Sequence, residues 1–239
     1  MADPLAGVDT YLRYFGSGLA VTLAVFAASL VVAFAAGIGM GLARLARWRV
    51  VRYPAVAVVE VLRGTSEIVQ LYWVFFALPL VTGFQLAPIA AGAIALGLNK
   101  GAYMAEVVRS AVQAVPRGQL EACVALNLSP LRRMQRVVLP QAIPRMLPPL
   151  ANDTIDLLKA TSVVSLITIA DLTFRAQQLR SLTGTSLVPF GAILVLYFLV
   201  AMGVGGVFRS VEERVAVGRP RRTGPPFAHL FARGQEQSR

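Results

Sequence analysis

The sequence has few of the residues that build metal, redox and catalytic sites. It contains one cysteine, Cys123, and one histidine, His229, among 239 residues. A single cysteine excludes an internal disulfide, and the lack of a CxxC pair or a histidine cluster removes the common zinc sites. The dipeptide Gly-Lys never occurs, so there is no GxxxxGK[ST] phosphate-binding loop. We therefore expect a chain that is not an enzyme and binds neither ATP nor a metal or other cofactor by itself.

Charged residues are also scarce, at 15% of the chain, whereas a soluble domain has about 25%. Hydrophobic residues make up 56%, and the mean hydropathy is +0.64. They gather in runs that reach the roughly 20 residues a membrane-spanning helix needs. The composition predicts an all-α polytopic membrane protein. We expect five spans, over about residues 16–42, 53–80, 88–108, 150–170 and 187–208.

The net charge of +11 reflects membrane topology better than nucleic-acid binding, because the basic residues lie just beyond the ends of the apolar runs. Of the 23 Lys and Arg, segment 43–52 holds four, segment 109–145 holds six, and the tail 209–239 holds seven. The segments expected on the other side hold only three. By the positive-inside rule, segment 1–15 is external, and the Gly/Pro/Arg-rich tail is cytoplasmic and predicted to be disordered.

A cytoplasmic insert separates the third and fourth predicted spans, and it reads as two short helices. In GQLEACVALNLSPLRRMQRVVLP, residues 118–140, apolar residues recur at the helical spacing of Leu120, Val124 and Leu128. Asn127 can end the first helix in the left-handed conformation. Ser129 and Pro130 suit the cap and first position of a second helix.

The second helix of the insert is expected to end at Pro140 and Pro144, because proline lacks the amide hydrogen that a helix interior uses. Two roles remain open for the insert on periodicity alone. It could lie on the lipid surface as an amphipathic helix. It could instead fill a groove of a partner protein and pass force to the spans.

Ionisable and polar residues within the predicted spans are candidates for a substrate pathway, because such residues are costly in a bilayer. These candidates are Glu60, Arg63, Glu67, Asn99, Tyr103, Glu106, Asp156 and Lys159. In the second predicted span the first three lie at i, i+3 and i+7, on one face of one helix. Asp156 and Lys159 are spaced to pair. Opposed charges suit a zwitterionic cargo, although a purely structural role for the same residues stays open.

The insert GQLEACVALNLSPLRRMQRVVLPQAI resembles the EAA loop of ABC importer permeases. Three further blocks, EVLRGTSEIVQLYWVFFALP, GLNKGAYMAEVVRSAVQAVPRGQ and LPPLANDTIDLLKATSVVSLI, resemble the polar amino acid permease family of the histidine and glutamine transporter type. The resemblance covers about residues 18–208. It implies a type I importer fold and a bacterial inner-membrane permease whose EAA loop, residues 116–148, couples it to a separate ATPase.

Residue by residue, the resemblance assigns Glu121, Ala122 and Cys123 to the E-A-A and Asn127 to the family's glycine, with Leu128 and Pro140 completing the coupling loop. Three positions depart from the pattern. Cys123 replaces alanine, Asn127 replaces glycine, and Ser66 replaces the proline of the usual R-G-T-P.

The resemblance also implies partners. These are two copies of an ATP-binding subunit carrying ATP and Mg²⁺, a second permease copy or paralogue, and an extracytoplasmic substrate-binding protein. The implied cargo is a polar amino acid or a related small zwitterion, and the blocks are also similar to the ectoine/hydroxyectoine permease type. The alternative is an ion channel or proton-coupled secondary transporter that uses the intramembrane carboxylates. We find no internal repeat of the kind common in secondary transporters.

Overall fold

The computed structural model describes residues 4–215, and this part of the chain is helical, without a strand. The α-helices are α1 (Pro4–Arg44), α2 (Arg49–Gly64), α3 (Glu67–Tyr72), α4 (Leu78–Thr82), α5 (Pro88–Gln113), α6 (Arg117–Ala125), α7 (Pro130–Arg133), α8 (Leu139–Ala160), α9 (Leu172–Thr183) and α10 (Leu187–Val215). Two π-helical turns, Trp73–Ala77 and Met134–Val138, and a 3₁₀ helix, Thr161–Ile167, join some of them. The predicted all-α class is confirmed.

The core of the bundle is the contact between α1 and α5, and glycines make that contact close. A Cβ added at Gly97 of α5 would lie 2.6 Å from the Cβ of Val32, and one at Gly101 would lie 2.8 Å from the Cβ of Ala36. On α1, Gly37 and Gly41 meet α5 in the same way. Pairs of small residues four apart let two membrane helices approach closely enough for their backbones to pack.

Larger side chains complete the core beside this contact. Leu96 and Met104 of α5 and Leu157 and Leu158 of α8 are fully or almost fully buried in one hydrophobic cluster. Helix α10 packs on α8 and α9 and leaves most of its apolar surface exposed. An exposed apolar surface of this size is expected where a helix faces lipid.

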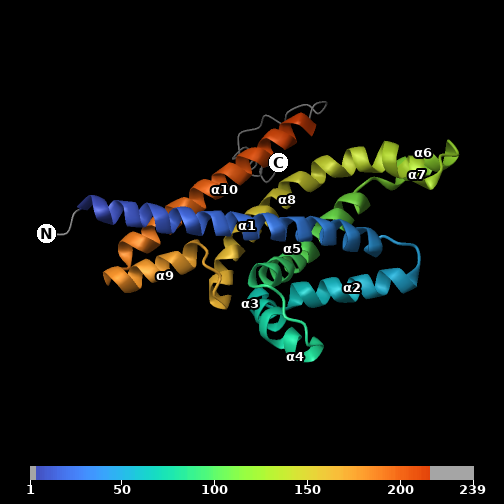
Figure 1. The fold of residues 1–239 in the computed structure, drawn as a ribbon. Helices are drawn as coiled ribbons and strands as arrows, with labels where there is room; N and C mark the ends of the chain where they lie inside the picture. The colour runs from blue at the N-terminus through green and yellow to red at the C-terminus, as the bar shows by residue number, and fades with distance from the viewer. Residues whose placement is uncertain (1–3, 216–239) are drawn as a thin grey trace, which may run out of the picture.

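The long helices place the short ones at opposite ends of the molecule. Figure 1 shows α6 and α7 at the far tip of the α5–α8 pair, beyond the C-terminal end of α1, whereas α9 lies near the start of α1. The EAA-like insert is thus separated from α9 by the length of the bundle. This separation is what the predicted topology needs if the insert and α9 face opposite sides of a membrane.

The helix boundaries differ from the predicted spans in several places; the fourth span, expected at 150–170, consists of the second half of α8 followed by the 3₁₀ helix Thr161–Ile167. Helix α1 has 41 residues and begins at Pro4, so part of the segment expected to precede the first span is helical. The second predicted span is not one helix, because it breaks between Gly64 and Glu67 with a bend of 106°. Helix α10 continues to Val215, and the predicted disorder of the remaining tail lies outside the described residues.

Within residues 4–215, two helices are long and apolar enough to cross a membrane, α10 and the Tyr11–Arg44 part of α1, and up to four spans result if each bent helix pair counts as one. Helix α5 has 26 residues, about 39 Å at 1.5 Å per residue, which exceeds the roughly 30 Å hydrocarbon core. The count of five spans stays a prediction.

Candidate functional site

The insert folds largely as its local signals predict. Helix α6 ends at Ala125, and Asn127 follows with a φ of 52°. The amide of Leu128 then donates to the carbonyl of Cys123 at 3.0 Å. This bond satisfies a carbonyl at the end of α6, as in the usual glycine-terminated helix. Asparagine therefore serves at the position where the resemblance expected glycine.

The turn after α6 leads directly into α7. The Ser129 side chain accepts a hydrogen bond from the Arg132 amide at 3.5 Å, and Pro130 occupies the first turn. The predicted cap and proline position are both confirmed. Together, α6, the Asn127 turn and α7 form a compact tip beyond the bundle (Figure 1).

The predicted end of the second insert helix at Pro140 and Pro144 is wrong. Helical structure runs from Pro130 through the π-turn Met134–Val138 into α8, which continues to Ala160 with three prolines in its interior. The π-turn lies immediately before Pro140, where the shifted hydrogen-bond pattern accommodates a missing amide hydrogen. The tip is therefore joined to the bundle by a helix rather than by a loop.

The tip exposes apolar and acidic side chains together. Val124, Leu126 and Leu131 are 59%, 73% and 67% exposed, and Glu121 is exposed on the same helix as Val124. Cys123 is buried at 4% exposure and anchors α6. Large apolar residues exposed together on a surface mark a contact site for lipid or for another protein.

A network of ion pairs joins the end of α1 to α2 and α5. Arg44 lies 3.3 Å from the carboxylate of Glu60 and 3.1 Å from that of Glu106, and its side chain is only 8% exposed. Arg63 lies 3.8 Å from Glu60, and Glu106 also binds Arg109. Glu60 and Glu106, predicted as pathway residues, thus share a cation that the sequence analysis had placed in a loop.

Replacing Arg44 by methionine is expected to lower the free energy of unfolding by about 1 kcal/mol, because Glu60 and Glu106 lose their shared partner but keep Arg63 and Arg109. The expected result is a drop in the thermal midpoint of the detergent-solubilised protein. Arg44→Lys keeps the charge and is expected to lose less. A thermal midpoint unchanged in Arg44→Met would show that the network contributes nothing to stability.

The prediction that Glu60, Arg63 and Glu67 share one helix face is wrong, because the helix breaks between Arg63 and Glu67. Glu67 lies in the first turn of α3 and pairs with Lys100 of α5 at 3.1 Å. Lys100 was not among the predicted site residues. The signal for it was present, since it is one of only three basic residues within the predicted spans.

Asn99 and Tyr103, two of the polar residues predicted on α5, face the break between α2 and α3. Asn99 is buried at 3% exposure and donates to the carbonyl of Leu62 at 3.0 Å. The Tyr103 hydroxyl donates to the carbonyl of Arg63 at 3.2 Å. Both side chains are therefore engaged by the backbone of α2.

On α8, the predicted pair of Asp156 and Lys159 is confirmed at 3.2 Å. The two side chains are 58% and 64% exposed, and Asn152 on the same face is also exposed. Exposed charges on a membrane-embedded helix are unfavourable against lipid. This face of α8 therefore needs water or another polypeptide beside it.

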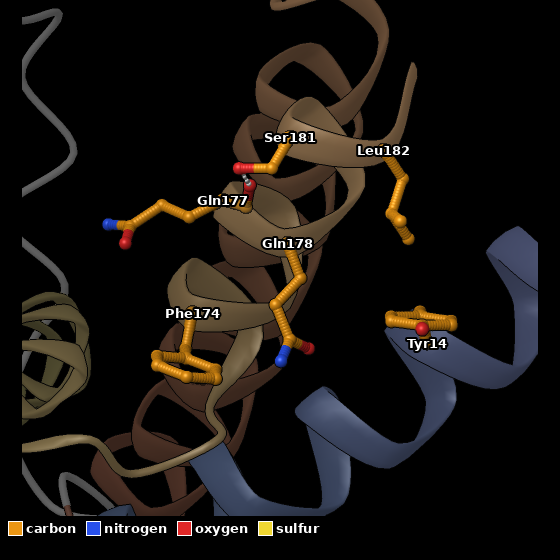
Figure 2. A pocket seen from close by; sticks show the side chains of 6 residues that line it. All are labelled: Tyr14, Phe174, Gln177, Gln178, Ser181 and Leu182. Carbon is orange, nitrogen blue, oxygen red and sulfur yellow. Dashed lines mark hydrogen bonds between the residues drawn. The ribbon is translucent and has the colours of Figure 1, made fainter. Parts of the chain in front are cut away.

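At the opposite end of the bundle, a pocket of about 400 Å³ lies between α1 and α9. Figure 2 shows Tyr14 of α1 facing Gln178 and Leu182 of α9 across it, with Phe174 on the other side of Gln178. The guanidinium of Arg175 lies 5.4 Å from the centre of the Tyr14 ring and donates to Gln178 at 2.9 Å. None of the site residues predicted from the sequence lines this pocket.

Comparison with known proteins agrees with this architecture. Residues 33–217 match the family of binding-protein-dependent transport system inner membrane components. A probable amino-acid ABC transporter permease protein of Sinorhizobium fredii is 41% identical over 89% of this chain and 91% of its own length. The glutamine transport system permease of Escherichia coli K12 is 32% identical over 84% of this chain and 92% of its own length. The arginine transport system permease of Bacillus subtilis is 32% identical over 83% of this chain and 90% of its own length.

Solved structures show the same fold. A chain from the crystal structure of an amino acid ABC transporter with histidines superposes with a TM-score of 0.80 at 32% identity, covering 90% of this chain and 99% of that one. An inward-facing methionine ABC transporter chain superposes with a TM-score of 0.73 at 19% identity, which supports the fold alone. This protein belongs to the binding-protein-dependent inner membrane transport components, and within them it is a permease subunit of the amino-acid ABC transporter type rather than an enzyme.

Proposed function

We propose that this permease subunit belongs to an ATP-driven importer and that a separate ATP-binding subunit binds the tip formed by α6 and α7. The observation that carries the proposal is the exposed set of Val124, Leu126 and Leu131 beside Glu121. A charged residue next to an apolar cluster is typical of a protein contact, with the apolar side chains filling a groove and the charge fixing the orientation.

The remaining residues of the coupling loop hold this surface in place. The Cys123 side chain lies on the buried face of α6, and Asn127 and Leu128 form the turn that ends this helix. Ala122 is exposed beside Glu121, where a larger side chain would keep a partner away. Pro140 follows the π-turn that joins the tip to α8. Because α8 is continuous from there, a push on the tip moves the helix that carries Asp156 and Lys159.

A cysteine introduced at the tip tests this contact directly. Cys123→Ala removes the only cysteine, and Leu126→Cys then offers one exposed thiol. In membranes from the native host, a thiol crosslinker is expected to join this chain to an ATP-binding subunit. The same crosslinker with Thr185→Cys, on the exposed turn before α10, serves as the control and is expected to give no such product.

In the proposed assembly, two ATP-binding subunits carry ATP and Mg²⁺ below a pair of permease subunits, which are two copies of this chain or this chain and a paralogue. The N-terminus is external and the C-terminus is cytoplasmic in a bacterial inner membrane. An extracytoplasmic substrate-binding protein delivers the cargo. The basic residues around α6 and after α1 support this orientation.

We further propose that the exposed face of α8 lines the substrate pathway. Asp156 and Lys159 present opposite charges on a spanning helix, which matches the carboxylate and ammonium of a zwitterion. Glu60, Arg63 and Glu67 border the same region in this proposal, whereas Glu106 is held by ion pairs with Arg44 and Arg109. The ion-channel and proton-coupled alternatives lose their support, because the chain's relatives are ABC transporter permeases.

Asp156→Asn is expected to reduce the uptake rate about tenfold, corresponding to roughly 1.4 kcal/mol, because Lys159 loses its partner and the pathway loses one of its charges. Assembly with the ATP-binding subunit is expected to stay intact. The measurement is radiolabelled uptake in whole cells, with the subunits quantified by immunoblot. Glu213→Gln, at the exposed end of α10, is the control. Uptake kinetics equal to wild type would remove Asp156 from the pathway.

For the cargo, we propose a polar amino acid or a small zwitterion such as ectoine or hydroxyectoine. Relatives include permeases named for arginine and for glutamine transport, and these names support the amino-acid class. The test is a thermal-shift screen of the cognate substrate-binding protein against glutamine, arginine, histidine and ectoine. A shift with ectoine alone would select the narrower cargo and exclude the amino acids.

A further inference from the structure

The break between α2 and α3 forms without a proline or a positive φ. The two joining residues, Thr65 and Ser66, have extended conformations with φ of −113° and −67°. Neither is proline, and Gly64 does not have a positive φ. Gly64, Thr65 and Ser66 all carry an amide hydrogen, so no proline obstructs a continuous helix at this point. Their low helix propensity weakens the helix here, but it does not by itself fix a bend of 106°.

Breaking a helix frees the carbonyl groups of its last turn, and at this site apolar side chains lie beside them. The break borders an apolar recess of about 400 Å³, whose lining includes Val61, Val69 and Trp73. In a bilayer, an unsatisfied carbonyl costs several kcal/mol. The straight helix would therefore be more stable than the bent one unless other groups donate hydrogen bonds to these carbonyls.

Side chains supply the missing donors for three successive carbonyls. The Thr65 hydroxyl donates to Val61 O at 2.8 Å, Gln70 Nε2 and Asn99 Nδ2 donate to Leu62 O at 2.8 and 3.0 Å, and the Tyr103 hydroxyl donates to Arg63 O at 3.2 Å. Asn99 also donates to Gln70 Oε1 at 3.2 Å, and Gln70 donates to Thr65 Oγ1 at 2.6 Å. The donors come from both sides of the break and from α5.

We propose that Thr65, Gln70, Asn99 and Tyr103 form a side-chain clamp that holds α2 and α3 bent, in place of a proline at position 66. The clamp acts as a positioning device for the permease. It fixes α3 so that Glu67, in its first turn, meets Lys100 of α5 at 3.1 Å. Asn99 is 3% exposed and already hydrogen-bonded twice, so it positions the helix break and does not bind cargo.

Ser66→Pro supplies an independent way to hold the same bend. Proline fixes φ near −65°, and Ser66 already has a φ of −67°. The residue before proline must be extended, as Thr65 is, with φ −113° and ψ 152°. No hydrogen bond from the Ser66 amide is present within residues 4–215, so its loss is not expected to disturb the native structure.

The test measures the bend directly in the assembled transporter. In a Cys123→Ala background, spin labels are placed at Val58 and Leu80, which are 50% and 87% exposed, and labelled chains are diluted with unlabelled ones. A continuous helix would separate these positions by about 33 Å at 1.5 Å per residue, and the bend shortens this by roughly 10 Å. Pulsed electron paramagnetic resonance in lipid nanodiscs resolves the two distances.

The clamp predicts a short distance in the wild type and a mixture with a longer one in Asn99→Leu and Gln70→Leu. Adding Ser66→Pro is expected to restore the short distance in both, and to restore the yield of folded protein if the single variants fold poorly. Ser110→Ala, whose hydroxyl bonds only within α5, is the matched control and keeps the short distance. A short distance in Asn99→Leu and Gln70→Leu without the proline, or a failure of the proline to restore distance and yield, overturns the clamp.

Discussion

Gly97→Val is expected to prevent accumulation of folded protein. A Cβ at this position would lie 2.6 Å from the Cβ of Val32 and 2.8 Å from the carbonyl oxygen of Ser29. Neither atom is the free end of a flexible side chain, so α1 and α5 must move apart along their main contact. Overpacking of a core costs about 1–3 kcal/mol and occasionally more, and here the backbone itself is displaced. We expect a loss of about 3 kcal/mol or more, measured as the monodisperse fraction after detergent extraction and as the thermal midpoint.

A matched pair on α1 provides the control for this prediction. Gly37 faces α5, where an added Cβ would lie 2.8 Å from the Cβ of Met104, whereas Gly39 has no atom within 4 Å. Gly37→Val is therefore expected to behave like Gly97→Val, and Gly39→Val like the wild type. Equal stability of Gly37→Val and Gly39→Val would contradict the close α1–α5 contact.

Glu121→Ala is expected to separate transport from ATP hydrolysis. Glu121 is exposed on α6, and no salt bridge to it is formed within residues 4–215, so its carboxylate is free for a partner. Alanine keeps the helix, because it has the highest helix propensity. Truncating one member of a buried charge pair at an interface costs about 2–5 kcal/mol. We therefore expect the ATP-binding subunit to bind at least about 30-fold more weakly.

The readouts for Glu121→Ala are uptake and ATP hydrolysis in the same proteoliposomes. Uptake is expected to fall more than tenfold, while any remaining hydrolysis no longer responds to the cargo-loaded binding protein. Glu213→Ala, a carboxylate removed at the exposed end of α10, is expected to leave both unchanged. Normal cargo-stimulated hydrolysis with Glu121→Ala would show that this side chain has no part in coupling.

The insert was predictable because its structure depends on neighbouring residues. Asn127 ends α6 with a positive φ, and Ser129 and Pro130 begin α7, each through its own conformational preference or a hydrogen bond a few residues away. The prolines of α8 led to a wrong prediction for the same reason. Local preference predicts a helix end at Pro140, but the π-turn before it and the packing of Ala142 and Met146 against α5 keep the chain helical.

The charged and polar residues of the spans could be found in the sequence, but their partners could not. Glu67 pairs with Lys100, and Arg44 joins Glu60 to Glu106 across three helices. These pairings depend on the break between α2 and α3, and on the close approach of α1 to α5. The break is held by contacts between residues up to 40 positions apart. Periodicity within one helix therefore gave a wrong common face for Glu60, Arg63 and Glu67, and their place in a substrate pathway stays a prediction.

The claim that the tip of this permease binds a separate ATPase is tested most directly by purification of the tagged chain from its native host in a mild detergent. The account predicts that an ATP-binding subunit co-purifies in near-stoichiometric amount and makes the preparation hydrolyse ATP. It also predicts that Leu126→Asp, which places a charge on the exposed apolar tip, abolishes this association while the permease stays folded and monodisperse. A wild-type chain that elutes alone without ATPase activity, or a Leu126→Asp variant that retains the ATPase, would contradict it.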